Sequence, residues 1–153
     1  MATFQPGAPQ SLIHPQLVTL RTAAALPAAG AYDVTPLVVA CPSFTRITLL
    51  GSYTRAAALG AATMALEFCP TATGAGAWYR LSEIAAGLLA AGADVANLTQ
   101  RSTLTYTSTA AGAESFVWDL ELPTAMERVR CACAESGAVG NPGTYVLDAL
   151  LSV

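Results

Sequence analysis

The chain has 153 residues, 54% of them hydrophobic, and its ten acidic and seven basic side chains give a net charge of −3 with no lysine at all. A chain of this length is typical of one domain. Its charge offers no basic surface for DNA or RNA phosphates, and it lacks the run of about 20 apolar residues that a membrane-spanning helix needs, so we expect neither nucleic acid nor membrane as a partner.

Residues 1–31 are expected to form an extended N-terminal arm. Prolines recur along this stretch, and proline favours extended or turn backbone while removing a hydrogen-bond donor. Only Gln16–Thr22 has the alternation of a strand. The arm is too apolar for a solvated tail, so it is expected to cover its own domain or to reach a neighbouring subunit. The residues expected at this interface are Phe4, Leu12, Ile13, Leu17, Val18 and Leu20.

Residues 32–153 are expected to form a β-sandwich domain, because short segments alternate apolar and polar residues between turns rich in glycine, proline and small residues. Ile84–Asn97, which is rich in alanine and glycine, is expected to be a loop with at most one helical turn. The segments Phe44–Thr54 and Ala62–Pro70 are expected to pair as a hairpin. The strands expected before residue 110 are Tyr32–Ala40, Phe44–Thr54, Ala62–Pro70, Trp78–Leu81 and Ser102–Ser108.

The C-terminal third, Glu114–Val153, shows the clearest strand pattern. Three runs alternate large apolar with polar residues, and a period of two places each apolar set on one face of a pleated strand. We expect these runs to form an antiparallel sheet. With about seven to nine short strands, the chain is predicted to be all-β, an antiparallel β-sandwich or jelly-roll-like barrel. The three apolar sets are Phe116, Trp118, Leu120 and Leu122; Val129, Cys131 and Cys133; and Tyr145, Leu147, Ala149 and Leu151.

The four cysteines are Cys41, Cys69, Cys131 and Cys133. Free cysteine is a small hydrophobic residue that is usually buried, so reduced core thiols are expected. Cys131 and Cys133 lie two apart on one strand face, which is a poor geometry for a disulfide. A zinc site made by all four remains the alternative, although no Cys-x2-Cys pair is present. No cofactor is expected.

Candidate catalytic residues are few, and we expect no enzymatic activity. His14 is the single histidine and lies in the arm, away from any strand that could hold it for nucleophilic catalysis. Asp119 and Glu121 share a strand face and could form a paired-carboxylate site, but a solvated strand face is the ordinary interpretation. Trp78 and Tyr79 could form a platform for a sugar or could belong to the core.

The glycine-rich stretches are not phosphate-binding loops. Gly74 and Gly76 lie in one of them, and Gly137–Gly143 forms the other. A phosphate loop requires a lysine and a following helix, and both are missing from the predicted elements.

Three groups of residues resemble the β-sandwich modules of tailed-bacteriophage virions, in particular the small head decoration (cementing) proteins. They are Phe44–Leu50 followed by Tyr53 and Thr54, the pair Trp78 and Tyr79, and Met126–Cys131 leading through Glu135–Gly137 to Gly143–Tyr145. The resemblance implies a virion structural protein without enzymatic activity, which stabilises the capsid by binding the lattice of major capsid protein as a homo-oligomer, with a trimer expected. It implies a location on the capsid exterior after synthesis in the host cytoplasm.

The alternative function is a carbohydrate- or receptor-binding β-sandwich module of a phage tail or cell surface, with Trp78 and Tyr79 as its platform.

Overall fold

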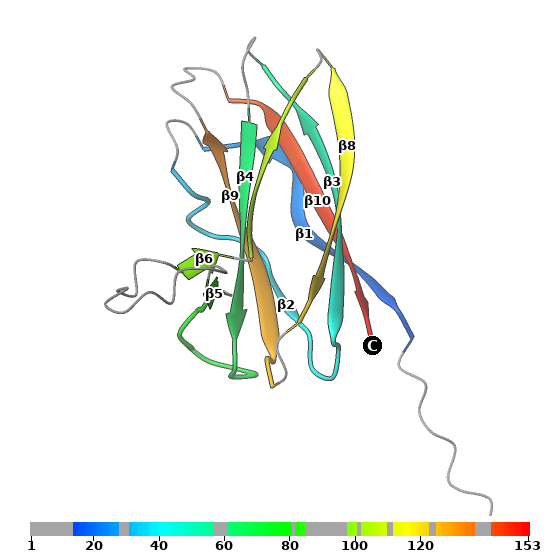
Figure 1. The fold of residues 1–153 in the computed structure, drawn as a ribbon, viewed down its shortest axis with the longest axis vertical. Coiled ribbons are helices and arrows are strands. Elements are labelled where there is room, and N and C mark those ends of the chain that lie inside the picture. The colour runs from blue at the N-terminus through cyan, green and yellow to red at the C-terminus, as the bar shows by residue number, and fades with distance from the viewer. Residues whose placement is uncertain are drawn as a thin grey trace, which may run out of the picture.

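The computed structural model describes residues 14–27, 31–56, 61–80, 82–84, 98–100, 102–109, 112–122, 125–136 and 142–153. These residues form two packed four-stranded sheets and a separate two-stranded hairpin (Figure 1). Sheet A has the order β1 (Gln16–Ala25), β10 (Thr144–Ser152), β3 (Arg46–Thr54) and β8 (Ala113–Glu121). Sheet B has the order β2 (Val38–Ala40), β9 (Arg128–Ser136), β4 (Ala61–Cys69) and β7 (Thr103–Thr107). The hairpin joins β5 (Ser82–Ile84) and β6 (Leu98–Gln100).

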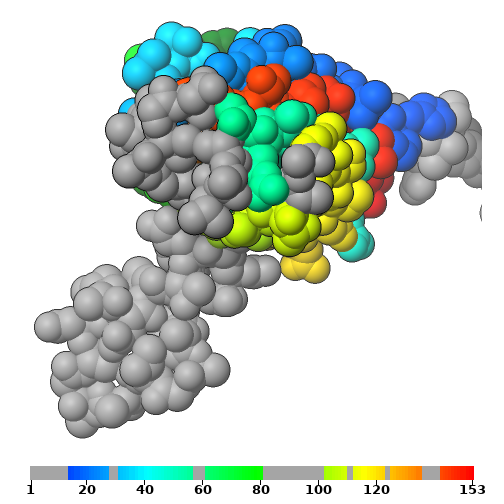
Figure 2. Space-filling model, turned by 90° about the horizontal axis from the view of Figure 1, so that it is seen from above, coloured from blue at the N-terminus to red at the C-terminus, as the bar shows by residue number. Residues whose placement is uncertain are grey.

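Every strand pair in both sheets is antiparallel, and the described residues contain no helix. The predicted all-β sandwich is therefore confirmed, and the two sheets do not close into a barrel. Figure 2 shows the sandwich from above, with β1, β10, β3 and β8 following one another in blue, red, teal and yellow.

The predicted pairing of neighbouring strands is wrong in two places. β3 and β4 do not form a hairpin, because β3 lies in sheet A between β10 and β8 whereas β4 lies in sheet B between β9 and β7. The three C-terminal strands do not form one sheet either, since β9 lies in sheet B and β3 separates β8 from β10. Two sheets that bury their apolar faces against each other are joined by connections that cross from one sheet to the other, so chain neighbours need not be spatial neighbours.

Two predicted strands are shorter than expected. Of Tyr32–Ala40, only β2 pairs as a strand, and Pro36 in the preceding segment has no N–H to give to a ladder. In the segment beginning at Trp78, the strand contact is a single bridge between Tyr79 and Phe68. The predicted loop Ile84–Asn97 lies outside the described residues except for Ile84, which ends β5.

The core lies between the inner faces of the two sheets. Along β10 the odd-numbered residues are fully buried and the even-numbered ones are partly exposed, which is the period of two that the sequence predicts. The same alternation buries one face of β3. The largest fully buried side chains are those of Tyr53, Tyr145 and Phe68.

A row of aromatic rings crosses the core from sheet B to sheet A. The Phe116 ring stacks on Tyr106 of β7 with the ring centres 4.5 Å apart, and it lies parallel to the Tyr145 ring at 6.1 Å. Gly51 is paired directly with Phe116 across β3 and β8. A side chain at Gly51 would collide with the Phe116 ring, so the bare backbone there makes room for the aromatic row.

Candidate interaction interface

The six residues predicted for the arm interface fall into two groups. Phe4, Leu12 and Ile13 lie outside the described residues. The other three belong to β1, which pairs with β10 of its own domain. Leu20 is buried in the core, Val18 packs partly against the core, and Leu17 points outward with 64% of its surface exposed. Of these three residues, Leu17 is therefore the one that remains available to another molecule.

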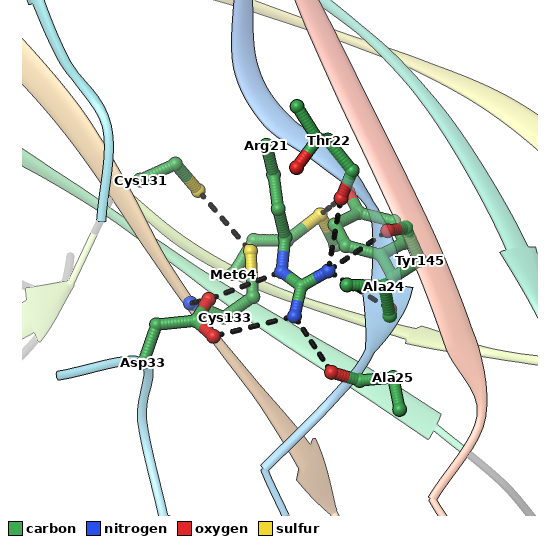
Figure 3. Close-up of polar contacts among 9 residues, drawn as sticks. All are labelled: Arg21, Thr22, Ala24, Ala25, Asp33, Met64, Cys131, Cys133 and Tyr145. Carbon is green, nitrogen blue, oxygen red and sulfur yellow. Dashed lines mark hydrogen bonds and ion pairs between the residues drawn. The ribbon is translucent and has the colours of Figure 1, made fainter. Parts of the chain in front are cut away.

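Arg21 fixes β1 in the sandwich (Figure 3). It lies where the register between β1 and β10 shifts, and such a bulge leaves backbone groups without their ladder partners. The guanidinium of Arg21 is buried and donates hydrogen bonds at 2.9 Å to the carbonyl oxygens of Ala24, Ala25 and Tyr145, with a longer one of 3.3 Å to Thr22. One side chain thus takes over the hydrogen bonding that the bulge interrupts.

Asp33 is the anionic partner of Arg21 and links the two sheets. Its carboxylate accepts hydrogen bonds from Arg21 at 3.1 and 3.3 Å and from the backbone N–H of Cys133 at 3.1 Å. Its own N–H donates to the Cys133 carbonyl at 2.9 Å. Because Arg21 belongs to sheet A and Cys133 to sheet B, this ion pair holds the edge strand β1 against both sheets. The pair borders a hollow of about 180 Å³ that Cys131 also lines.

Trp78, the proposed sugar platform, is engaged by the chain itself. Its ring lies 4.2 Å from the Arg130 guanidinium carbon and 5.4 Å from that of Arg128, which are cation–π distances. Arg130 also pairs with Glu67 at 2.7 Å, and Glu67 pairs with Arg80 at 3.2 Å. These contacts support a structural role for Trp78 on the outer side of sheet B. Tyr79 is 54% exposed.

The carboxylate pair Asp119 and Glu121 does not have the environment of a general acid. Asp119 accepts hydrogen bonds from Arg46 at 2.8 and 2.9 Å and from the Thr48 hydroxyl at 2.9 Å. The bond from Arg46 is the main reason why the pKa of Asp119 is lowered to about 2. A catalytic acid needs the opposite shift. Glu121 is exposed.

We expect the replacement Arg46→Gln to raise the pKa of Asp119 from about 2 toward its ordinary value of 3.8. A carboxylate with a lowered pKa stabilises the folded state above its unfolded pKa, and this contribution is lost as the pH falls through the folded pKa. The contribution is therefore expected to disappear between about pH 4 and pH 2. Titration of the Asp119 carboxyl carbon by NMR measures both values, and an unchanged midpoint in the variant would contradict the assigned cause.

The four cysteines are buried, as predicted, and all four are free thiols. The sulfur atoms of Cys131 and Cys133 lie 3.8 Å apart on the inner face of β9. Burial raises the pKa of Cys41 to about 11. The Thr71 hydroxyl and the Arg128 guanidinium contact Cys69 and lower its pKa. Within the described residues, no three His, Cys, Asp or Glu side chains lie close enough together to hold a metal ion.

His14 and the two glycine-rich stretches do not come together in one site within the described residues. His14 is exposed two residues before β1. Gly74 has a positive φ of 77° and accepts a hydrogen bond from Arg128 through its carbonyl oxygen. Of the glycine-rich stretch 137–143, only Pro142 and Gly143 belong to the described residues.

No protein-family model, curated protein or solved structure matches this chain. Across the described ranges, no helix is long and apolar enough to cross a membrane.

Sequence reasoning missed two buried polar groups. Arg21 lies within the predicted strand Gln16–Thr22, whose pattern rests on apolar residues and gave no signal that Arg21 is buried. Glu135 is 1% exposed and accepts hydrogen bonds from the Tyr53 hydroxyl at 2.5 Å and from the Gly143 N–H at 3.1 Å. A sequence signal existed for Glu135, because it continues the inward-facing series of Val129, Cys131 and Cys133.

Proposed function

We propose that this protein is a virion structural protein that decorates a bacteriophage capsid. It would bind the lattice of major capsid protein on the capsid exterior as a homo-oligomer, the trimer being the state that the resemblance implies. The proposal combines that resemblance with one observation, the attachment of β1. Residues 1–15 precede β1 in the sequence, and β1 is held by ladder hydrogen bonds to β10, by the buried Leu20 and by the Arg21–Asp33 pair.

This attachment is what an anchoring arm requires at its base. A force on the segment before residue 14 is passed through β1 to β10, which lies inside sheet A rather than at its edge. A weakly attached arm would peel from its own domain before it held a neighbour. An arm that buries apolar surface on a neighbour contributes about 25 cal/mol per Å², and in a symmetric lattice the same contact recurs at every copy.

Deletion of residues 1–15 is expected to weaken capsid binding by on the order of 100-fold, because Phe4, Leu12 and Ile13 are lost while β1 remains. A deletion that continues to Pro27 would remove β1 and Leu20 and so would test folding instead. The measurement is co-sedimentation with capsids assembled from the major capsid protein encoded in the same genome. A variant in which residues 1–15 are replaced by an equally long Gly/Ser segment separates the effect of apolar contacts from that of length.

Two outcomes would count against this function. Failure of the full chain to sediment with capsids contradicts decoration, and undiminished binding by the truncated chain contradicts the role of the arm. Glycan binding by the full chain that disappears in Trp78→Ala would favour the carbohydrate-binding alternative.

A further inference from the structure

We propose that the outer face of sheet A is the self-association surface of this protein and that it packs against the same face of another copy of this chain. This inference deepens the proposed function, since it rests on the homo-oligomer named there and assigns the surface that holds it. The observations that carry it are a diagonal apolar stripe, the size of the face, the distribution of charge on it and its uneven relief.

The apolar stripe, made by Leu17, Leu150, Leu50 and Val117, runs diagonally across all four strands of sheet A. Leu17 is paired directly with Leu150, and Leu50 is paired directly with Val117. Leu150 is opposite Thr48, which is two residues from Leu50 on the same face of β3, a diagonal spacing that long side chains can bridge. Leu17, Leu50 and Val117 are 64%, 41% and 67% exposed. An exposed stripe that crosses a whole sheet is unusual for a surface that faces only water.

The outer face of sheet B differs from that of sheet A. Ala65, Ala132 and Ala134 alternate with core residues and so point outward, yet all three are buried. Arg128 on this face reaches Thr71 and Gly74, and Arg130 reaches Trp78. The chain therefore covers part of sheet B with its own residues and leaves the stripe on sheet A exposed.

The face is large enough for a specific contact between copies. Four strands of nine or ten residues cover about 30 Å by about 19 Å, or roughly 570 Å². Two such faces together remove roughly 1,100 Å² from water, which is above the value of about 1,000 Å² expected of a biological interface.

Charge on this face does not oppose contact between identical surfaces. Arg46, Asp119 and Glu121 gather at one end of β3 and β8, where Arg46 and Asp119 form an ion pair. Asp148, nearer the centre, accepts a hydrogen bond of 2.8 Å from the Thr19 hydroxyl. The stripe itself carries no charge, so like charges need not meet across it.

The shape of the face is also compatible with packing against a second copy. Leu17 is exposed at the β1 side, whereas a hollow of about 420 Å³ opens toward the β8 side, bordered by Leu50, Ser52, Ser115, Val117, Val146 and Asp148. A two-fold axis that lies between the two faces and perpendicular to the stripe places the stripe of one copy on that of the other in the reverse direction, so the Leu17 end of each copy meets the Val117 end of its partner.

The test is the mass of the full chain and of three variants by sedimentation equilibrium. Val117→Glu and Leu17→Glu place a carboxylate in the stripe, and both are expected to raise the dissociation constant at least about 100-fold, because each symmetric contact loses the same apolar burial. Val34→Glu is the matched control, since Val34 is 94% exposed but lies outside sheet A, and it should keep the mass of the parent. Circular dichroism verifies that each variant is folded.

The proposal is overturned if folded Val117→Glu and Leu17→Glu retain the mass of the parent. It is also overturned if the parent is monomeric at about 100 μM, since a dissociation constant of about 1 μM would leave little monomer at that concentration. Capsid co-sedimentation of the same proteins separates this surface from the proposed function. A parent that self-associates through the stripe but ignores capsids supports the surface and contradicts decoration. If the parent is monomeric and Val117→Glu abolishes its capsid binding, the contact between copies is overturned. Decoration is then still supported, and the outer face of sheet A binds the capsid protein instead.

Discussion

Replacement of Arg21 by methionine is expected to lower the free energy of unfolding by about 3–5 kcal/mol, the usual cost of removing one partner of a buried ion pair. The variant leaves the Asp33 carboxylate without its cation, and the side chain of Asp33 is only 19% exposed. It also removes the donor that serves the carbonyl oxygens of Ala24, Ala25 and Tyr145. Methionine retains most of the aliphatic volume, so lost packing contributes little. Urea denaturation followed by circular dichroism measures the change.

Two further variants test whether the loss of stability comes from the buried Arg21–Asp33 pair. Arg46→Met removes an exposed ion pair with Asp119, which should change stability far less than Arg21→Met does, because solvent screens an exposed pair. Arg21→Met combined with Asp33→Asn should be less destabilised than the sum of its parts, because the uncompensated carboxylate is gone. A loss below about 1 kcal/mol in Arg21→Met would show that the Arg21–Asp33 pair does not hold β1 in the sandwich.

The attachment of β1 by Arg21 also links the stability of the domain to the proposed capsid binding. If β1 detaches in Arg21→Met, the arm loses its base while residues 1–15 keep their sequence. We therefore expect capsid binding and thermal stability to fall together in this variant, whereas deletion of residues 1–15 should reduce binding alone.

Replacement of Gly51 by alanine is expected to destabilise the domain by about 1–3 kcal/mol, the range found for overpacked cores. A Cβ atom at this position would lie far closer to the Phe116 ring than van der Waals contact allows. The ring cannot move freely, since it stacks on Tyr106 and lies parallel to Tyr145. Elsewhere, exchange of glycine for alanine in a compatible conformation stabilises a protein by about 0.4–1 kcal/mol. Here the steric term is the larger one, so the sign reverses.

Thermal unfolding measures this effect, and a decrease of roughly 2–4 °C in Tm is expected for each kcal/mol in a domain of this size. Phe116→Leu makes room beside Gly51, so Gly51→Ala should cost much less in that background than in the parent. An equal cost in both backgrounds would mean that the Phe116 ring is not the obstacle. An increase in Tm for Gly51→Ala alone would contradict the packing described for the aromatic row.

The sequence by itself determined which residues face the core along most strands. The apolar sets of β8, β9 and β10 alternate with a period of two, and this period follows from the geometry of a single strand without reference to its neighbours. For this reason the burial of Tyr145, Leu147, Cys131 and Cys133 could be predicted, and so could the all-β class.

Only the tertiary structure decided which strands are neighbours. Alternation is a property of one strand, whereas pairing depends on contacts between segments far apart in the chain, such as β3 with β10 and β4 with β9. The same limit explains Arg21. By simple alternation, Arg21 would lie on the outer face of β1, because the preceding Leu20 is buried on the inner face. A register shift against β10 instead turns the Arg21 side chain inward toward Asp33. The stripe on sheet A could not be predicted from the sequence for a similar reason. Leu17, Leu50 and Val117 come together only when β1, β10, β3 and β8 lie side by side.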